Sequence, residues 1–172
     1  MARIVIGIGA NLSPEANIRR GLELLAEHTR VLAISTFYRS PALARPEQAD
    51  YLNGAAALET ALSPADLKAL LRAIEHALGR QRTPDKLAAR PIDLDVLVFG
   101  RELVAPREEL LARPFVALPL AQLAPELVLP GAGRLGDLPS RFEGHGMEEL
   151  PELASELRRA LGLEREEGAQ AP

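Results

Sequence analysis

The order of hydrophobic patterns along the chain restricts the folds that it can adopt. Strands appear as short apolar or alternating runs, and helices as apolar residues repeated every three or four positions. Four strand patterns and two helix patterns are found, in the order strand, helix, strand, strand, helix, strand, at 3–9, 14–28, 31–38, 51–60, 64–79 and 92–99. The first strand, RIVIGIG, is β-branched and continuous, which is typical of a central strand buried on both faces.

Each helix pattern begins with the same pair of residues. Ser13-Pro14 and Ser63-Pro64 place a serine where a helix N-cap is expected and a proline at the first helical position. We therefore expect both serines to cap their helices.

This order of elements is that of an α+β, ferredoxin-like βαββαβ fold. Right-handed crossovers predict an antiparallel sheet with strand order 4-1-3-2 and with the helices packed on one face. We expect one domain over residues 1–172, with a core at about 3–130 and a C-terminal helical extension in 131–172. The helix of the extension is predicted from a leucine stripe at Leu150, Leu153, Leu157 and Leu161. The last ten residues, LEREEGAQAP, are expected to be frayed.

Composition excludes several classes of protein. Of the 172 residues, 47% are hydrophobic and 26% charged, as in soluble globular proteins, and the absence of cysteine excludes disulfides and thiolate metal sites. No signal peptide or membrane span is recognised, so we expect a cytoplasmic monomer without a membrane partner. The net charge of −4 argues against a nucleic-acid partner. GIGANL (residues 7–12) matches a dinucleotide fingerprint only in part, because Leu12 occupies the position of its third glycine.

Two carboxylates stand at one end of the last strand pattern, RPIDLDVLVFG. Asp93 and Asp95 are two positions apart, so their side chains point to the same face and their Cα atoms lie roughly 6.6 Å apart. Such a pair suits Mg²⁺, which binds one or two protein carboxylates together with phosphate oxygens. The alternative is an exposed strand end that acidic residues keep soluble. If the pair holds metal, removing either carboxylate should leave the stability of the metal-free protein unchanged or higher.

The predicted topology brings further polar residues to the same edge of the sheet. The ends of the first two strands, the starts of the last two and the end of the second helix all meet there. The residues so collected are Gly9, Ala10, Asn11, Ser40, Pro41, Ala42, Leu43, Tyr51, Asn53, Glu75, Arg80, Arg82, Arg90, Asp93 and Asp95.

These side chains suit a flat heterocycle and a polyphosphate. Arginine forks match phosphate oxygens, and Arg80, Arg82 and Arg90 flank the carboxylate pair. Tyr51 and Asn53 share one strand face and offer a ring to stack and an amide to hydrogen-bond. The alternatives are a solvated basic loop and a tyrosine at the rim of the core. Glu75, at the margin of its helix stripe, has a similar alternative as a boundary residue.

Five segments together resemble one enzyme family. STFYRSPAL, DYLNGAAALET, IEHALGRQR, RPIDLDVLVFG and RPFVALPLAQLAPEL are similar to the 6-hydroxymethyl-7,8-dihydropterin pyrophosphokinase family of folate biosynthesis. The resemblance extends from about residue 3 to about residue 130. It implies a ferredoxin-like α+β fold and transfer of the β,γ-diphosphate of ATP to the pterin hydroxymethyl group, with release of AMP and the participation of two Mg²⁺ ions.

The resemblance also implies roles for individual residues. Asp93 and Asp95 would hold both metal ions, and Arg80 and Arg90 would join them as catalytic residues. The pterin site would consist of two stacking rings and groups that read the edge of the heterocycle, namely Tyr51, Phe115, Asn53, Ser40 and Leu43. The ATP site would consist of Glu75, Arg82, Arg107 and Arg113.

The chain departs from the family pattern in two places. Leu87-Ala88-Ala89 replaces an aromatic or polar residue followed by Gly/Ala-Pro, and Pro106-Arg107 replaces Pro-His after a shortened segment. We interpret Arg107 as a permanent cation in place of a titrating histidine. Two alternatives belong to other functional classes: a ligand-sensing regulatory domain on the same fold, and an RNA-binding sheet. The second lacks the basic, aromatic strand face that such a sheet requires.

Overall fold

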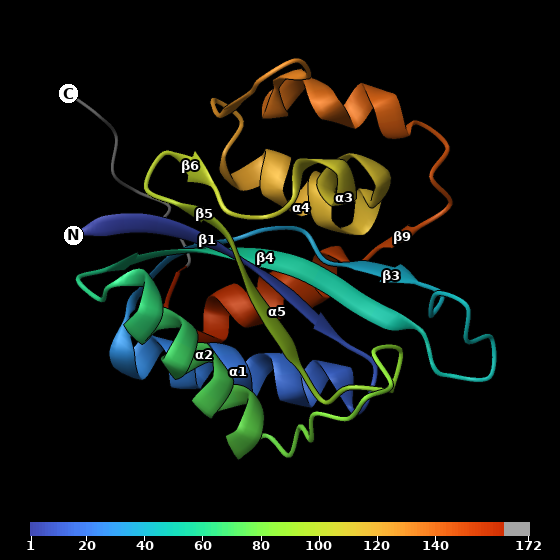
Figure 1. The fold of residues 1–172 in the computed structure, drawn as a ribbon. Coiled ribbons are helices and arrows are strands. Elements are labelled where there is room, and N and C mark those ends of the chain that lie inside the picture. Colours follow the sequence, from blue (N-terminus) through green and yellow to red (C-terminus); the bar gives the residue numbers. More distant parts are fainter. Residues whose placement is uncertain (164–172) are drawn as a thin grey trace.

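The computed structural model describes residues 1–163, in which an antiparallel sheet lies between two helical layers (Figure 1). The long strands are β1 (Ala2–Ala10), β4 (Tyr51–Thr60) and β5 (Asp93–Phe99). β1 lies at the centre and pairs antiparallel with both β4 and β5. The full sheet runs β6-β5-β1-β4-β3-β9, with β2 also paired to β4, so the predicted order 4-1-3-2 is confirmed. The short edge strands are β6 (Glu102–Leu103) and β9 (Glu148–Glu149).

The strand predicted at 31–38 is divided into β2 (Arg30–Ile34) and β3 (Tyr38–Ser40). The break has a local cause at Ser35, whose Oγ accepts a hydrogen bond from the Ala55 N–H at 2.8 Å. Two residues later the ring of Phe37 is completely buried against Gly54. A Cβ at Gly54 would lie 2.6 Å from this ring, so the close approach of Phe37 to β4 requires the glycine.

The two predicted helices lie on one face of the sheet, as expected. They are α1 (Pro14–His28) and α2 (Pro64–Ala77), and α5 (Pro151–Ala160) joins them (Figure 1). Their apolar stripes pack on the side chains of β1 that point to this face, Ile4, Ile6 and Ile8. Burial of this apolar surface is the main force that holds the layer on the sheet.

The helices expected from the sequence account for the cover of only one face of the sheet. A second layer covers the opposite face and consists of α3 (Arg107–Ala112), α4 (Pro114–Leu123), a 3₁₀ helix η1 (Leu135–Phe142) and the hairpin of β7 (Val128–Leu129) and β8 (Gly133–Arg134). It buries the apolar residues of the second sheet face, which are Val5, Ala55, Ala57, Leu97 and Val98. A strand that is apolar on both faces must be packed against other elements on both faces. The pattern RIVIGIG therefore already indicated a second layer.

Only one of the two predicted serine caps is found. Ser63 caps α2, because its side chain accepts a hydrogen bond from the Asp66 N–H at 3.1 Å. Ser13 adopts a left-handed conformation with φ of 39° and its side chain makes no capping bond. The tight turn before α1 allows the N–H groups of Asn11 and Leu12 to reach the Arg90 carbonyl, so this turn is held by a distant loop.

The predicted C-terminal extension contributes to both layers. The helix expected from the leucine stripe is α5, and its Leu153 and Leu157 are buried with the residues of α1 and β1. Arg158 Nη2 also donates to the Ile34 carbonyl at 2.9 Å. Nearly all of LEREEGAQAP lies outside the described residues, so its fraying stays a prediction.

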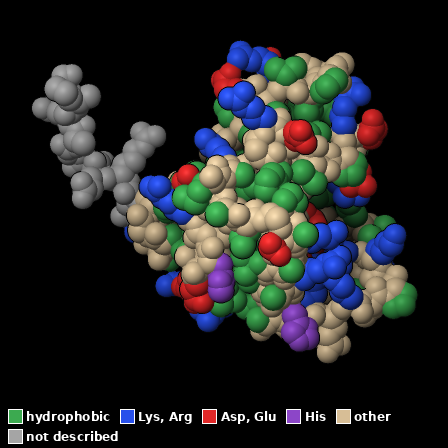
Figure 2. All heavy atoms as spheres, turned by 60° about the vertical axis from the view of Figure 1, so that its left-hand side comes forward, with side chains coloured by type: hydrophobic (Ala, Val, Ile, Leu, Met, Phe, Trp, Pro, Cys, Tyr) green, Lys and Arg blue, Asp and Glu red, His purple; other side chains and the backbone are tan. Residues whose placement is uncertain are grey.

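The described surface mixes charges of both signs. On the face shown in Figure 2, acidic and basic side chains are interspersed with hydrophobic ones, apart from one group of basic side chains at the lower right. Within residues 1–163, none of the helices has both the length and the apolar character needed to cross a bilayer.

The packing of α5 gives a test of its contribution to the fold. Leu157→Ala removes a side chain that is 2% exposed, and such a change in a core costs about 2–5 kcal/mol. We expect the free energy of unfolding to fall by this amount in urea titrations. Glu156→Ala, at the exposed neighbouring position, is the matched control and should change it by less than about 0.5 kcal/mol. Equal stability of the two variants would show that α5 does not share the core.

Candidate active site

The predicted convergence at one edge of the sheet is confirmed by the strand register. Gly9, near the end of β1, is paired with Asn53 of β4 on one side and with Asp93 of β5 on the other. A Cβ at Gly9 would lie 2.8 Å from Asn53 Oδ1. Because Gly9 has no side chain, the space between the amide of Asn53 and the carboxylate of Asp93 stays open.

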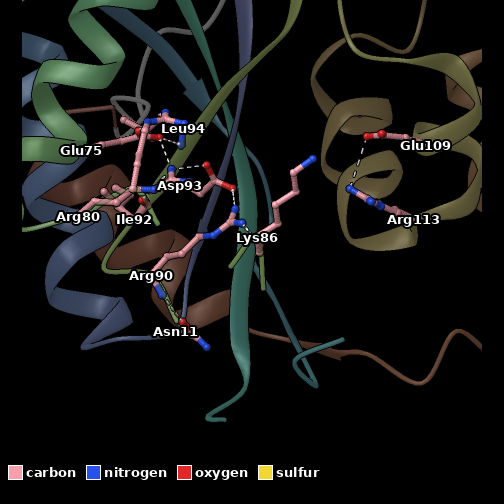
Figure 3. Close-up of polar contacts among 11 residues, drawn as sticks. Asn11, Glu75, Arg80, Lys86, Arg90, Ile92, Asp93, Leu94, Glu109 and Arg113 are labelled. Carbon is pink, nitrogen blue, oxygen red and sulfur yellow. Dashed lines mark hydrogen bonds and ion pairs between the residues drawn. The ribbon is translucent and has the colours of Figure 1, made fainter. Parts of the chain in front are cut away.

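Asp93 lies between two arginines (Figure 3). Its Oδ1 accepts a hydrogen bond from Arg80 Nη1 at 2.6 Å, and its Oδ2 accepts one from Arg90 Nη1 at 2.6 Å. Arg90 Nη2 also donates to the Lys86 carbonyl. Charge-assisted bonds of this kind are among the strongest in proteins, so each oxygen of Asp93 is firmly held.

Glu75 supports this arrangement from below the sheet. The residue is 3% exposed, and its Oε1 accepts bonds from Arg80 Nη1 at 2.7 Å and from the Leu94 N–H at 2.8 Å. Its Oε2 accepts a bond from Arg82 Nη2 at 3.1 Å. Burial alone would lower the pKa of Arg80, but the neighbouring Asp93 and Glu75 outweigh it and raise that pKa above its ordinary value. The Arg80 guanidinium is therefore a permanent cation.

Asp95 differs from Asp93 although both point to the same face. It has no hydrogen bond or ion pair with any of the residues that the structure describes. The residue as a whole is exposed, yet the pocket walls desolvate its carboxylate, and the charges of Asp93 and Glu75 add to this effect. Together they raise the pKa of Asp95 to about 6, against the lowering effect of Arg80 and Arg90. Asp95 is thus a carboxylate with a poorly compensated charge.

The pair Asp93 and Asp95 suits a hard cation, such as Mg²⁺, that is also coordinated by the phosphate oxygens of a bound substrate. The described residues contain no cluster of three or more acidic or histidine side chains that would hold a metal alone. Two carboxylates suit Mg²⁺ when phosphate oxygens and water complete its octahedral shell. A cation near Asp95 would also neutralise the charge that burial disfavours.

A cavity of about 420 Å³ opens beside the carboxylates. It is lined by all five residues predicted for the pterin site, Ser40, Leu43, Tyr51, Asn53 and Phe115, and by Asp93, Arg90 and Arg113. Asn53 Nδ2 donates to Ser40 Oγ at 3.3 Å, which orients the amide toward the cavity. A larger cavity of about 650 Å³ lies at the opposite ends of β1 and β5, but it contains no carboxylate pair. We therefore assign the site to the smaller cavity.

The remaining predicted residues lie in different places. Arg113 pairs with Glu109 at 3.5 Å on the far side of the cavity, across from Asp93 (Figure 3). Arg82 is exposed except for its bond to Glu75. Arg107 lies beside the β7–β8 turn, where a Cβ at Gly131 would be 3.3 Å from its Nη2. Arg107 lines none of the three cavities that are lined by Asp93 or Asp95, so its proposed contact with ATP stays a prediction.

Sequence reasoning missed two residues at this site. Gln48 lines the cavity from the loop before β4, and nothing in the composition of that loop distinguished it. Asn11 was placed at the edge by topology but given no role, although it is a buried polar residue beside a partial glycine motif.

Comparison with known proteins identifies similar chains. Residues 5–125 match the family model of 7,8-dihydro-6-hydroxymethylpterin-pyrophosphokinase. The 2-amino-4-hydroxy-6-hydroxymethyldihydropteridine pyrophosphokinase of Pseudomonas aeruginosa is 38% identical over 158 residues, which cover 87% of this chain and 97% of that protein. The protein of the same name from Haemophilus influenzae is 33% identical over 159 residues, covering 87% and 99%. That from Bacillus subtilis is 33% identical over 131 residues, covering 71% and 78%. The resemblance found in the sequence is therefore confirmed.

The unequal environments of the two carboxylates predict unequal effects on stability. The folded pKa of Asp95 lies above its ordinary value of 3.8, so the folded state binds the proton more tightly than the unfolded state. The contribution of Asp95 to stability therefore falls as the pH rises from about 4 to about 6, and remains low above it. In EDTA, we expect Asp95→Asn to melt at or above the wild-type temperature at pH 7 and to lose this advantage near pH 4.

Asp93→Asn should behave in the opposite way. It removes the anion that pairs with Arg90 and one of the two anions that pair with Arg80, at a cost of about 1–3 kcal/mol at pH 7. This replaces the expectation that both deletions would be harmless. Thermal unfolding of both variants between pH 4 and 8 tests the difference, and equal losses of stability would contradict it.

Proposed function

This chain belongs to the 7,8-dihydro-6-hydroxymethylpterin-pyrophosphokinase family, and on that premise we propose which residues bind each substrate, the metal ions and the phosphates. The protein is a transferase that moves a diphosphate from ATP to the hydroxymethyl group of 6-hydroxymethyl-7,8-dihydropterin in folate synthesis. The comparisons give no support to a regulatory domain. The main support for these assignments is that one cavity combines two aromatic rings, the amide of Asn53 and the arginine-bound carboxylate of Asp93.

The pterin is proposed to bind in the cavity of about 420 Å³. Tyr51 and Phe115 would hold its ring between two aromatic faces, while Asn53 and the groups at Ser40 and Leu43 read its polar edge. Burial of Tyr51 raises the pKa of its hydroxyl, so the ring remains neutral beside a neutral substrate. This arrangement matches a flat heterocycle that carries hydrogen-bonding groups on its rim.

Asp93 and Asp95 are proposed to hold Mg²⁺, with two ions expected from the family. When bound, the ions would neutralise the negative charge that develops on the phosphate oxygens during transfer. The poorly compensated charge of Asp95 supports this assignment, as does the place of both side chains on one strand face. Asp93 would keep the position that its arginines give it.

Arg80 and Arg90 are proposed to orient the triphosphate. Each guanidinium has five N–H donors and uses only some of them within the protein. The remaining donors would hold the phosphates in line with the hydroxymethyl oxygen. That oxygen bonds to the β-phosphorus, the bond from this phosphorus to the α,β-bridging oxygen breaks, AMP leaves and the hydroxyl proton passes to solvent.

The other charged residues are proposed to form the outer part of the ATP site. Glu75 would act on the nucleotide mainly through Arg80 and Arg82, because both of its oxygens are bound by them in the structure. Arg113 would approach the phosphates from the α4 side of the cavity. A contact of Arg107 with ATP would require its guanidinium to leave the side of Gly131.

We further propose that the protein works as a cytoplasmic monomer, in one domain over residues 1–172, without a nucleic-acid partner. The mixed charges on the surface and the net charge of −4 support the last point. The burial of α5 in the same core as α1 supports a single domain.

The reaction itself gives the first test. With ATP, Mg²⁺ and the hydroxymethyl dihydropterin, we expect AMP and pterin diphosphate in equal amounts, and no reaction in EDTA. Asp95→Asn should lower the rate at least about 100-fold while remaining folded, because removing one charge-stabilising group typically costs this much. Chromatography of the nucleotides measures both. ADP as the equimolar product would overturn the proposed function.

Tyr51 tests the stacking role. Loss of stacking and of ring burial together is worth about 2–3 kcal/mol, so Tyr51→Ala should weaken pterin binding roughly 30- to 150-fold. Binding of ATP should change by less than about threefold, and Tyr51→Phe should be mild for both. Isothermal calorimetry with each substrate separately measures these affinities. Equal weakening of both would assign Tyr51 to the fold instead.

A further inference from the structure

Asn11 is a buried polar residue without a role in the reaction proposed above. It follows β1 directly and is 2% exposed. Its Oδ1 accepts a hydrogen bond from the Arg90 N–H at 2.8 Å, a contact drawn in Figure 3. Its Nδ2 donates to Gln48 Oε1 at 3.1 Å and to the Ala49 carbonyl at 3.2 Å. One side chain therefore contacts two loops that are some forty positions apart in sequence.

Gln48 completes the connection between these loops. While its Oε1 accepts from Asn11, its Nε2 donates to the Leu87 carbonyl at 2.8 Å. The main chain at the end of β1 adds two bonds, from the Asn11 and Leu12 N–H groups to the Arg90 carbonyl at 3.1 and 3.2 Å. We call the side-chain bonds of Asn11 and Gln48 the amide relay.

The two joined loops serve different substrates. The loop at 41–50 carries Leu43 and leads into Tyr51, which belong to the proposed pterin site. The loop at 78–92 carries Arg80, Lys86 and Arg90, which lie on the phosphate side. The amide relay therefore joins the part of the chain that meets the pterin to the part that meets the nucleotide.

A second link between the loops is weaker. Arg45 Nη2 pairs with Asp85 Oδ2 at 2.8 Å, but both side chains are more than a third exposed, at 35% and 43%. Exposed ion pairs contribute little, because water and salt screen them. Hydrogen bonds of a buried amide are not screened in this way, and leaving such a group unsatisfied is costly.

We propose that Asn11 and Gln48 are positioning residues that couple the binding of the two substrates. The inference rests on the proposed function. A ligand that orders one loop also orders, through the relay, the loop that must receive the second ligand. The second ligand then loses less conformational freedom on binding and binds more tightly. Such coupling is reciprocal, so each substrate raises the affinity for the other by the same factor.

Calorimetry tests the coupling directly. The probes are 6-hydroxymethyl-7,8-dihydropterin and an ATP analogue with a methylene group in place of the α,β-bridging oxygen, both with Mg²⁺. Each dissociation constant is measured alone and with the other probe saturating, and their ratio is the coupling factor. For wild type we expect a factor of about 5 to 150. Gln48→Met and Asn11→Ala should each lower it at least about 3-fold, toward a factor of one.

Arg45→Gln is the matched control, since it removes the exposed link between the same loops and should change the factor less than twofold. Gln48 is only half-buried, so Gln48→Met carries the test if Asn11→Ala does not fold. Variants that weaken each probe alone but keep the wild-type factor would have a merely structural role, and the inference would be overturned. A wild-type factor of one would overturn it as well. Failure of the proposed function would appear differently, as wild type that forms no AMP from ATP.

Discussion

The buried carboxylate of Glu75 is the group on which the geometry of the site depends. It lies between α2 and β5 and accepts a hydrogen bond from the main chain of Leu94, between the two aspartates. A buried charge without a partner is strongly destabilising, so the position of Glu75 requires the guanidinium of Arg80 next to it. Arg80 in turn holds one oxygen of Asp93. The end of a helix, an arginine and the start of a strand are thus fixed by one charge.

This chain of ion pairs also explains why two aspartates of the same strand differ. Their spacing makes them equivalent in the sequence, but only Asp93 lies within reach of the arginines. The sheet edge therefore presents one carboxylate that the protein has already neutralised and one that it has not. Catalytic sites commonly contain such pairs, because carboxylates in different environments have different pKa values and can serve different chemical roles.

Much of the fold and site was predictable, because hydrophobic period and helix caps are local. α1, α2, β4 and β5 were recognised from such signals, and chirality then gave the strand order. The second layer was missed because α4 is apolar nearly all around and its prolines hide the helical period. The turn at Ser13 and the role of Asn11 were missed for another reason. Both depend on Arg90, which is distant in sequence, and no local pattern reports a contact of that kind.

The part of the chain after α4 passes from one side of the sheet to the other. η1 packs on α4 in the second layer through Leu135 and Leu138, β9 pairs with the edge strand β3, and α5 returns to the side of α1 (Figure 1). The residues that complete the two cores therefore follow all the proposed site residues in the sequence. During translation, the second layer cannot be completed until Leu138 has left the ribosome, and the α1 side cannot be completed until Leu157 has followed. The nascent chain carries its whole active-site sequence well before it has the packing to hold that site in shape.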